Sequence, residues 1–186
     1  ELAKKDVIIG LGEIGLPLFN LISKFTIAEG YDIKPELRNK PKFSQYENLD
    51  VLFLHICIPF SKNFFREIYS LYKKYHPQVI VIHSTVSPYT TKNLQKKLPI
   101  PVIYSATRGI HKRMLSDLKR YTKFYAIEPK TPRAKWASSA FSLLMKKCGI
   151  KTKKMSSPVT LELAKILVDT SYYGWLINYA QITNAV

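Results

Sequence analysis

The sequence predicts a doubly wound α/β fold, with helices covering both faces of a mainly parallel sheet. Two observations predict it. Short, nearly continuous apolar runs alternate along the chain with amphipathic stretches of helical length, as is typical of strands that are buried on both faces of a parallel sheet. A glycine-rich turn also joins the first apolar run to the first helical stretch. We expect one such domain over residues 1–157, since a chain of 186 residues corresponds to about one domain.

The apolar runs, rich in β-branched residues, are expected to be the strands. They cover residues 6–9, 51–58, 79–83, 102–104 and 124–127, and a further strand is expected to end near Asp32. The intervening amphipathic stretches cover residues 14–24, 63–75, 90–98 and 136–147. Regular alternation of strand and helix predicts a parallel sheet with crossover helices.

The last segment, residues 158–186, has a different pattern and is expected to form one long helix. Pro158 stands where such a helix could begin, and no strand-like run follows it. Its aromatic residues point around much of the helix circumference, so they cannot all face one sheet. These residues are Tyr172, Tyr173, Trp175 and Tyr179. We therefore expect an interface helix that pairs the chain with a second copy of itself in a homodimer.

The composition is strongly basic, with 29 Lys and Arg against 13 Asp and Glu and a net charge of +16. Such a surface attracts polyanions, but the basic residues are spread in short clusters and no nucleic-acid-binding motif is present. Nucleic acid is therefore not expected as a specific partner, although polyanion binding remains an alternative function. The apolar runs are too short for a membrane span, and two cysteines make no disulfide framework. We expect a protein of the reducing cytoplasm.

The sharpest local signal is a glycine-rich turn, G-L-G-E-I-G, at residues 10–15. Gly10 permits a tight turn, Gly12 lets a pyrophosphate approach the backbone, and Gly15 lets the helix pack closely on the strand. Glu13 and Ile14 complete the turn. The free N–H groups at the start of the helix would then face the anion. The turn predicts a dinucleotide-binding domain of the Rossmann type. The alternative is a glycine-rich turn between strand and helix that binds no ligand.

Asp32 supplies the acidic residue that such a domain needs about 20 residues further on. Its carboxylate can accept hydrogen bonds from both ribose hydroxyls of an adenosine, and it would repel a 2′-phosphate. NAD is therefore expected as the cofactor rather than NADP. Lys34 and Arg38 lie nearby in the sequence and act against this preference.

Four segments resemble, in order, the UDP-glucose/GDP-mannose dehydrogenase family. They are GLGEIGLPL at 10–18, LHICIP at 54–59, HSTVSPYTT at 83–91 and LELAK at 161–165. The resemblance implies an NAD-dependent oxidoreductase that acts on an alcohol of a small-molecule substrate, namely a sugar or a sugar nucleotide. It further implies that Pro59 closes a loop over the cofactor, that Ser84 and Thr85 line the nicotinamide end, and that Thr85 and Lys165 are catalytic residues. In the family, the helix with this lysine leads to a dimer core.

The sequence departs from the family at three catalytic positions. Arg108 stands about where the family has a glutamate, and Asp169 replaces an asparagine four residues after the helix lysine. The family's nucleophilic cysteine lies in a further domain, and neither Cys57 nor Cys148 matches it. Cys57 lies inside an apolar run, where a buried thiol is the simpler interpretation.

The replacing residues can still form a catalytic and substrate-binding site. Lys165 and Asp169 lie four residues apart on one helix face, which would place a proton donor beside an acceptor. Arg108 and His111 follow a parallel strand, so they would lie at the edge of the sheet where ligands bind, and Arg108 offers a planar fork for a carboxylate or phosphate. Alternatively, Lys165 and Asp169 form only a surface ion pair, and Arg108 and His111 are solvated loop residues.

Three functions remain open from the sequence. The leading hypothesis is the NAD-dependent dehydrogenase, the second is a non-catalytic module or subunit that binds NAD(H), and the third is a polyanion-binding protein. No spacing of His, Cys and Asp resembles a zinc site, so no metal is expected. His55 and His83 lie in or beside apolar strands and are interpreted as core histidines.

Overall fold

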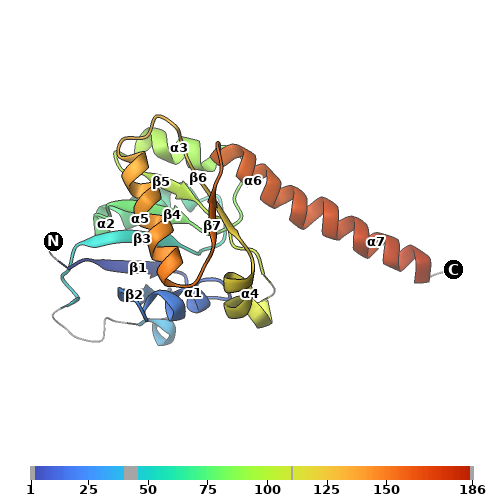
Figure 1. Cartoon of the computed structure of the whole chain (residues 1–186), viewed down its shortest axis with the longest axis horizontal. Coiled ribbons are helices and arrows are strands. Elements are labelled where there is room, and N and C mark those ends of the chain that lie inside the picture. Colours follow the sequence, from blue (N-terminus) through green and yellow to red (C-terminus); the bar gives the residue numbers. More distant parts are fainter. Residues whose placement is uncertain (1–2, 40–45, 110, 185–186) are drawn as a thin grey trace.

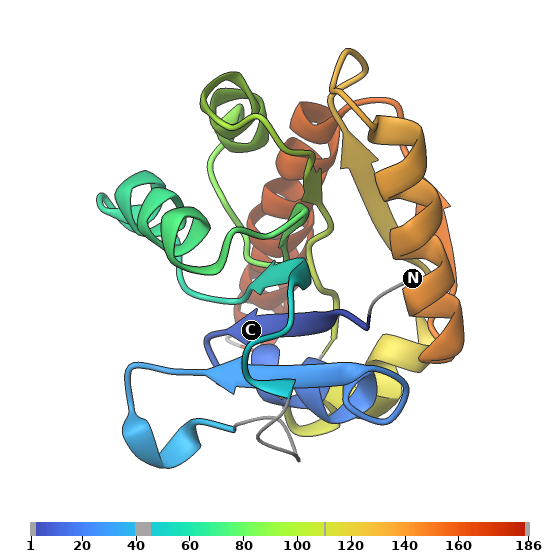
Figure 2. The same cartoon turned by 90° about the vertical axis from the view of Figure 1, so that its left-hand side faces the viewer.

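The computed structural model describes residues 3–39, 46–109 and 111–184, and these form one sheet with helices on both sides (Figures 1 and 2). The seven strands found among these residues lie in the order β2-β1-β3-β4-β5-β6-β7. They are β1 (Lys5–Ile9), β2 (Ile27–Tyr31), β3 (Val51–Ile56), β4 (Val79–Ile82), β5 (Val102–Tyr104), β6 (Lys123–Ile127) and β7 (Thr152–Lys154). The predicted doubly wound α/β fold is confirmed.

The sheet is mainly parallel, and its strand order reverses beside β1. Strands β1 to β5 pair in parallel, β6 runs antiparallel to β5, and β7 is parallel to β6. The chain goes from β1 to β2 on one side and then returns to β3 on the other side. The crossover connections therefore separate at the carboxyl ends of β1 and β3, and such a switch point is where doubly wound sheets bind ligands.

Two hydrophobic cores lie on opposite faces of the sheet. One face is covered by α1 (Gly15–Ile22), α4 (Met114–Arg120) and α5 (Ala134–Lys147). The other face is covered by α2 (Phe64–Tyr75) and α3 (Thr90–Lys97), together with the start of α6 (Pro158–Leu167). All four residues of β4 are buried, as expected for a central strand between two helical layers. Short 3₁₀ turns occur at Pro35–Leu37 and His111–Arg113.

The register of β1 on β3 shifts between Lys5 and Val7. At this point the backbone N–H of Phe53 donates to Asp6 Oδ1 at 3.2 Å, while Asp6 Oδ2 accepts from the Thr26 hydroxyl at 3.1 Å. The buried Asp6 carboxyl thus takes a donor that the strand ladder would otherwise use. Asp6 links β1 to the start of β3 and to the turn before β2.

The terminal segment is a long helix, as predicted, but it is not a uniform one. α6 is followed by a π-helical turn (Val168–Tyr172) and then by α7 (Tyr173–Asn184), and residues 185–186 of the predicted helix lie outside the described residues. α6 packs against α3, β5 and β6, whereas α7 extends away from the sheet (Figure 1). None of the described helices is both long and apolar enough to cross a membrane.

Candidate functional site

The turn after β1 needs glycine at two positions for different reasons. Gly10 has φ +86°, and a Cβ there would also lie 3.0 Å from the backbone of Cys57. A Cβ at Gly15 would lie 1.7 Å from the carbonyl oxygen of Gly10, so α1 can start this close to β1 only with glycine. A Cβ at Gly12, in contrast, would meet nothing within 4 Å. The backbone at Gly12 is therefore open to a ligand.

Asp32 follows β2, where the sequence places it, and its carboxylate is held by the backbone. Oδ2 accepts from Leu11 N–H at 2.7 Å and Oδ1 accepts from Lys34 N–H at 2.9 Å. Desolvation is the largest single influence on this carboxyl and opposes ionisation, but the backbone hydrogen bonds and the charge of Lys34 together outweigh it and lower the pKa of Asp32 below its ordinary value. Each oxygen keeps a second lone pair, so the ionised carboxylate can still accept two ribose hydroxyls.

A pocket of about 810 Å³ joins the glycine turn to the end of β2, the loop after β3 and α2. Most of the predicted cofactor residues line it, namely Gly10, Gly12, Glu13, Ile14, Asp32 and Pro59. Gly15 is buried beneath the turn. Ser84 and Thr85 lie outside this pocket: the Ser84 hydroxyl donates to the Ile58 carbonyl at 2.5 Å, and the Thr85 side chain is exposed.

Arg38, one of the two basic residues beside Asp32, is committed to other contacts. Arg38 Nε donates to the carbonyl of Asp32 at 2.7 Å, and the guanidinium lies 4.7 Å from the centroid of the Tyr31 ring. This arrangement leaves the Asp32 carboxylate without an arginine partner of its own among the described residues. The open Gly12 backbone, the ionised Asp32 and a pocket within the usual size of ligand sites fit a nicotinamide dinucleotide.

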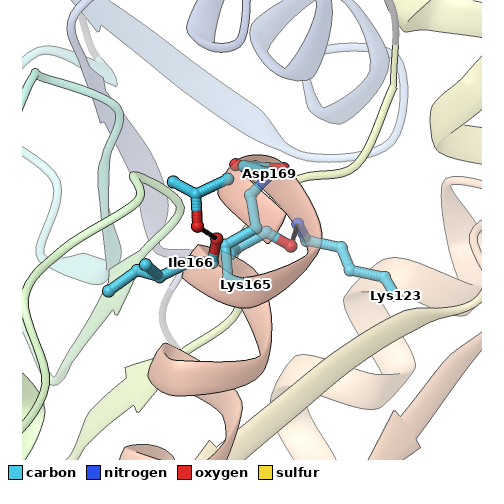
Figure 3. Close-up of polar contacts among 6 residues, drawn as sticks. Lys123, Lys165, Ile166 and Asp169 are labelled. Carbon is cyan, nitrogen blue, oxygen red and sulfur yellow. Dashed lines mark hydrogen bonds and ion pairs between the residues drawn. The ribbon is translucent and has the colours of Figure 1, made fainter. Parts of the chain in front are cut away.

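A second, smaller pocket of about 190 Å³ lies at the carboxyl end of β5, under α6. Arg108 and Lys165 both line it, so the structure brings together two of the predicted site residues. Lys165 Nζ forms the predicted ion pair with Asp169, with Nζ–Oδ distances of 2.7 and 2.9 Å (Figure 3). The backbone of His111 lies in a 3₁₀ turn, but its side chain is outside the described part of the structure.

Lys123 also lines the smaller pocket, and the sequence interpretation missed it. Its side chain reaches from the start of β6 toward the helix that carries Lys165 (Figure 3). Burial lowers the pKa of Lys123 to about 7, with the Cys57 thiol opposing this shift and the Lys165 charge adding to it. The sequence signal is weak, since lysine before a strand is usually solvated.

Glu162 is a second residue that the sequence interpretation did not single out. It is fully buried on α6, and its Oε1 accepts from the Thr91 N–H at 2.8 Å and from the Thr91 hydroxyl at 2.7 Å. Burial raises the pKa of Glu162, although the hydrogen bonds from Thr91 oppose the rise. The carboxyl sits at the first turn of α3, where a helix favours a negative charge. This contact fixes α6 at the edge of the sheet one turn before Lys165.

The core below the site contains neutral groups. His55 Nδ1 and His83 Nε2 lie 2.9 Å apart in a stacked, buried pair. Burial lowers the pKa of His55 to about 3, with a contribution from the Lys123 charge, and the pKa of His83 also falls far below its ordinary value. Burial raises the pKa of Cys57 to about 12, so its thiol is no nucleophile. Within the described residues, no group of three or more His, Cys, Asp or Glu could hold a metal ion.

The fold resembles that of several solved dehydrogenases. UDP-D-ManNAc dehydrogenase from Pyrococcus horikoshii matches with a TM-score of 0.71 and 16% identity over 89% of this chain and 50% of its own. 3-Hydroxyisobutyrate dehydrogenase from Mycobacterium tuberculosis has a TM-score of 0.71 and 13% identity, and the match covers 97% of this chain and 64% of that protein. Prephenate dehydrogenase from A. aeolicus, in complex with hydroxyphenyl propionate and NAD+, has a TM-score of 0.68 and 16% identity. This match covers 99% of the present chain and 70% of that protein.

These similarities are structural and cover only part of the neighbouring proteins. The chain spans 50% and 64% of the length of the first two of them. Neither a protein-family model nor the sequence of a curated protein matches this chain. The comparisons therefore establish a dehydrogenase-like fold.

Proposed function

We propose that this protein is an NAD-dependent dehydrogenase that oxidises an alcohol of a sugar or a sugar nucleotide. The observation that carries the proposal is that a pocket suited to a dinucleotide and a lysine-bearing pocket lie along the same carboxyl edge of the sheet. Cofactor and substrate could therefore meet at the edge where this fold binds its ligands.

The glycine turn and Asp32 would hold the cofactor. The open backbone at Gly12 and the first N–H groups of α1 face the pyrophosphate, and the Asp32 carboxylate accepts the ribose hydroxyls. The carboxylate also disfavours a 2′-phosphate, which supports NAD over NADP. Thr85 and Pro59 would border the nicotinamide end. When bound, the dinucleotide supplies the acceptor for the substrate's hydride.

Lys165 would act on the oxygen of the alcohol. Asp169 lies 2.7 Å from Lys165 Nζ and holds the amine in place on the helix surface. The ammonium can donate a hydrogen bond to the substrate oxygen and stabilise the negative charge that develops as the hydroxyl proton passes to solvent water. Asp169 keeps the lysine oriented along the helix surface and is therefore a positioning residue in this scheme.

Replacement of Lys165 by Ala tests the enzymatic part of the proposal. We expect nearly unchanged NAD binding in calorimetry but a large loss of turnover, measured as NADH formation with a panel of UDP-sugars, because the lysine touches only the substrate. Lys119→Ala, which removes an exposed lysine of α4 outside both pockets, should retain activity. Full activity of the Lys165→Ala protein would contradict this role.

A second candidate function is a non-catalytic module that binds NAD(H). The half-buried Cys57 thiol, whose pKa is raised to about 12, and the arginine at position 108 favour it, because neither can replace the family's catalytic cysteine and glutamate. In that case NAD would bind to the wild-type protein without any turnover of UDP-sugars.

We also infer that α7 pairs with a second copy of this chain. Its apolar side chains are largely exposed, and contiguous patches of this kind usually mark interfaces. The exposed side chains of α7 are Trp175, Leu176, Ile177, Tyr179 and Ile182. The side chain of Tyr173, expected at the same interface, is outside the described part of the structure.

A further inference from the structure

We propose that the 190 Å³ pocket under α6 is an anion-binding subsite that holds a carboxylate or phosphate of the substrate. In this subsite Arg108 is the outer cation, Lys123 is the buried cation, and the Thr107 hydroxyl is the donor between Lys123 and the ligand. Only the placement of this anion beside the oxidised alcohol rests on the proposed dehydrogenase function. Anion binding itself is measurable without cofactor or turnover.

The pocket has the size and the walls of a subsite for one small group. Its volume of about 190 Å³ is below the range usual for whole ligands. Apolar side chains form much of its wall and would exclude water from a bound anion. These side chains are Leu118, Phe124, Leu161 and Val168. A charge–charge contact is stronger in such surroundings than in bulk water.

Two of the cations that line the pocket have no carboxylate partner among the described residues. Lys165 is paired with Asp169 at 2.7 Å, and Asp117, which lines the same pocket, lies 3.9 Å from the guanidinium of Arg113. In the part of the chain that the structure describes, no carboxylate lies within ion-pair distance of Arg108 or Lys123. The guanidinium of Arg108 instead lies 4.8 Å from the centroid of the Tyr121 ring. The pocket therefore has an excess of positive charge.

Lys123 is held only by neutral acceptors, which leave its charge uncompensated. Nζ donates to the Ser105 carbonyl at 2.9 Å, to the Thr107 hydroxyl at 3.0 Å and to the Ala106 carbonyl at 3.3 Å. The three N–H groups of the ammonium are thus used. Because Thr107 Oγ1 accepts from Lys123, its own hydroxyl hydrogen remains free to donate. Thr107 lines the pocket, so a bound anion would accept from a hydroxyl that is polarised by a buried ammonium.

Anion binding should be coupled to the protonation of Lys123. The titratable groups that interact with this amine are Cys57 at the end of β3, His55 on β3, His83 after β4 and Lys165 on α6. The thiol and both imidazoles are neutral near pH 7, because burial raises the pKa of Cys57 and lowers that of both histidines. The pKa of Lys123 itself is lowered to about 7. A nearby anion raises this pKa, so binding takes up a proton and weakens as the pH rises above about 7.

The experiment measures binding of glycolate and of inorganic sulfate to the full chain without cofactor, by calorimetry at about pH 6 and about pH 8. Neither probe changes its charge in this range, so any change in affinity comes from the protein. We expect at least one probe to bind, with a dissociation constant that rises by up to about tenfold per pH unit above the pKa of Lys123. Stronger binding of glycolate identifies a carboxylate subsite, and stronger binding of sulfate identifies a phosphate subsite.

Variants assign the effect to individual residues. Lys123→Met should weaken binding at about pH 6 by about tenfold or more and remove the pH dependence. Arg108→Gln should weaken binding at both pH values and leave the ratio of the two dissociation constants unchanged. Thr107→Val, which keeps the side-chain shape and the buried lysine, should also weaken binding and remains informative if Lys123→Met does not fold. Lys119→Met is the control and should bind like the wild type.

Three results would overturn the subsite: no binding of either probe, equal wild-type affinity at both pH values, or an unchanged pH dependence in Lys123→Met. These outcomes are independent of the proposed function. A protein that binds glycolate but neither binds NAD nor turns over UDP-sugars would keep the subsite and lose the dehydrogenase. A protein that oxidises UDP-sugars but binds neither glycolate nor sulfate would keep the dehydrogenase and lose the subsite.

Discussion

At the scale of single residues, buried ionisable groups are held by hydrogen bonds with neutral partners. Lys123 is held by two carbonyls and a hydroxyl, Glu162 by the backbone and hydroxyl of one threonine, and Asp6 by a hydroxyl and a backbone N–H. Such partners offset only part of the cost of burying a charge, which is why burial dominates the pKa of each of these groups. Their protonation is therefore coupled to folding or to binding.

Asp6 should make the stability of the protein depend on pH. Burial raises its pKa to about 7, against the hydrogen bonds from Thr26 and Phe53, whereas in the unfolded chain the value is about 4. The folded state therefore binds the extra proton between about pH 4 and about pH 7, and the stability contributed by Asp6 falls as the pH rises through this window. Asp6→Asn, which stays neutral, should lack this contribution and melt at a higher temperature than the wild type at about pH 8.

Thermal unfolding at about pH 5 and about pH 8 provides the measurement. Asp50→Asn, at an exposed position just before β3, serves as the control and should follow the wild type. If the melting temperature of Asp6→Asn relative to the wild type does not rise between about pH 5 and about pH 8, burial does not determine the pKa of the Asp6 carboxyl.

At the scale of elements, α6 is the part that connects the sheet to the candidate catalytic lysine. Glu162 joins α6 to the first turn of α3 through Thr91, and Lys165 follows on the next turn. We expect Glu162→Ala to lower the free energy of unfolding by about 1–3 kcal/mol, because it leaves the Thr91 N–H and hydroxyl unpaired. Urea unfolding measures this loss.

Amide hydrogen exchange distinguishes local from global loosening in this variant. Exchange should accelerate in α6 and in the first turn of α3 more than in β4, because only the contact between the two helices is removed. Glu162→Gln keeps one acceptor for Thr91 and should show a smaller effect. Exchange that accelerates equally in all three elements would mean that Glu162 does not serve as a local anchor.

The elements that sequence patterns predicted well are the ones whose side chains are uniformly buried. The run V-I-V-I at 79–82 can hardly be anything except a central strand, and it is β4. β7 consists of Thr-Lys-Lys, with no apolar periodicity, and pairing with β6 places it in the sheet. α4 follows a basic loop and contains only seven residues, too few for a clear helical pattern. The π-helical turn at Val168–Tyr172 likewise has no local signal.

The geometry of the candidate site was predictable where one motif determines the local conformation. The glycine turn and Asp32 lie together as their spacing predicted, and Lys165 and Asp169 pair as expected for residues four apart on a helix. Lys123 and Glu162 were not predictable, because their burial depends on contacts with segments far away in the sequence. Local patterns do not contain this information.

At the scale of the whole molecule, the exposed helix α7 is where we expect the chain to pair with a second copy. Trp175 is 75% exposed, and a homodimer would bury it with its apolar neighbours. Trp175→Glu should therefore convert a dimer into a monomer, because burying an unpaired carboxylate at the interface is unfavourable. Light scattering checks this mass change. Tyr69→Glu places the same charge at an exposed aromatic of α2 and should leave the mass unchanged, and a monomeric wild-type protein would contradict the pairing.

The most direct measurement is a calorimetric titration of NAD into the wild-type protein and into Gly12→Val, with NADP titrated in parallel. A side chain at Gly12 meets no protein atom within 4 Å at its Cβ, so the variant should fold normally while its side chain occupies the space of the pyrophosphate. We predict that the wild type binds NAD more tightly than NADP, because Asp32 repels a 2′-phosphate, and that Gly12→Val binds neither. A wild-type protein that binds no dinucleotide, or a folded Gly12→Val protein that binds NAD as well as the wild type, would contradict the assignment of this pocket.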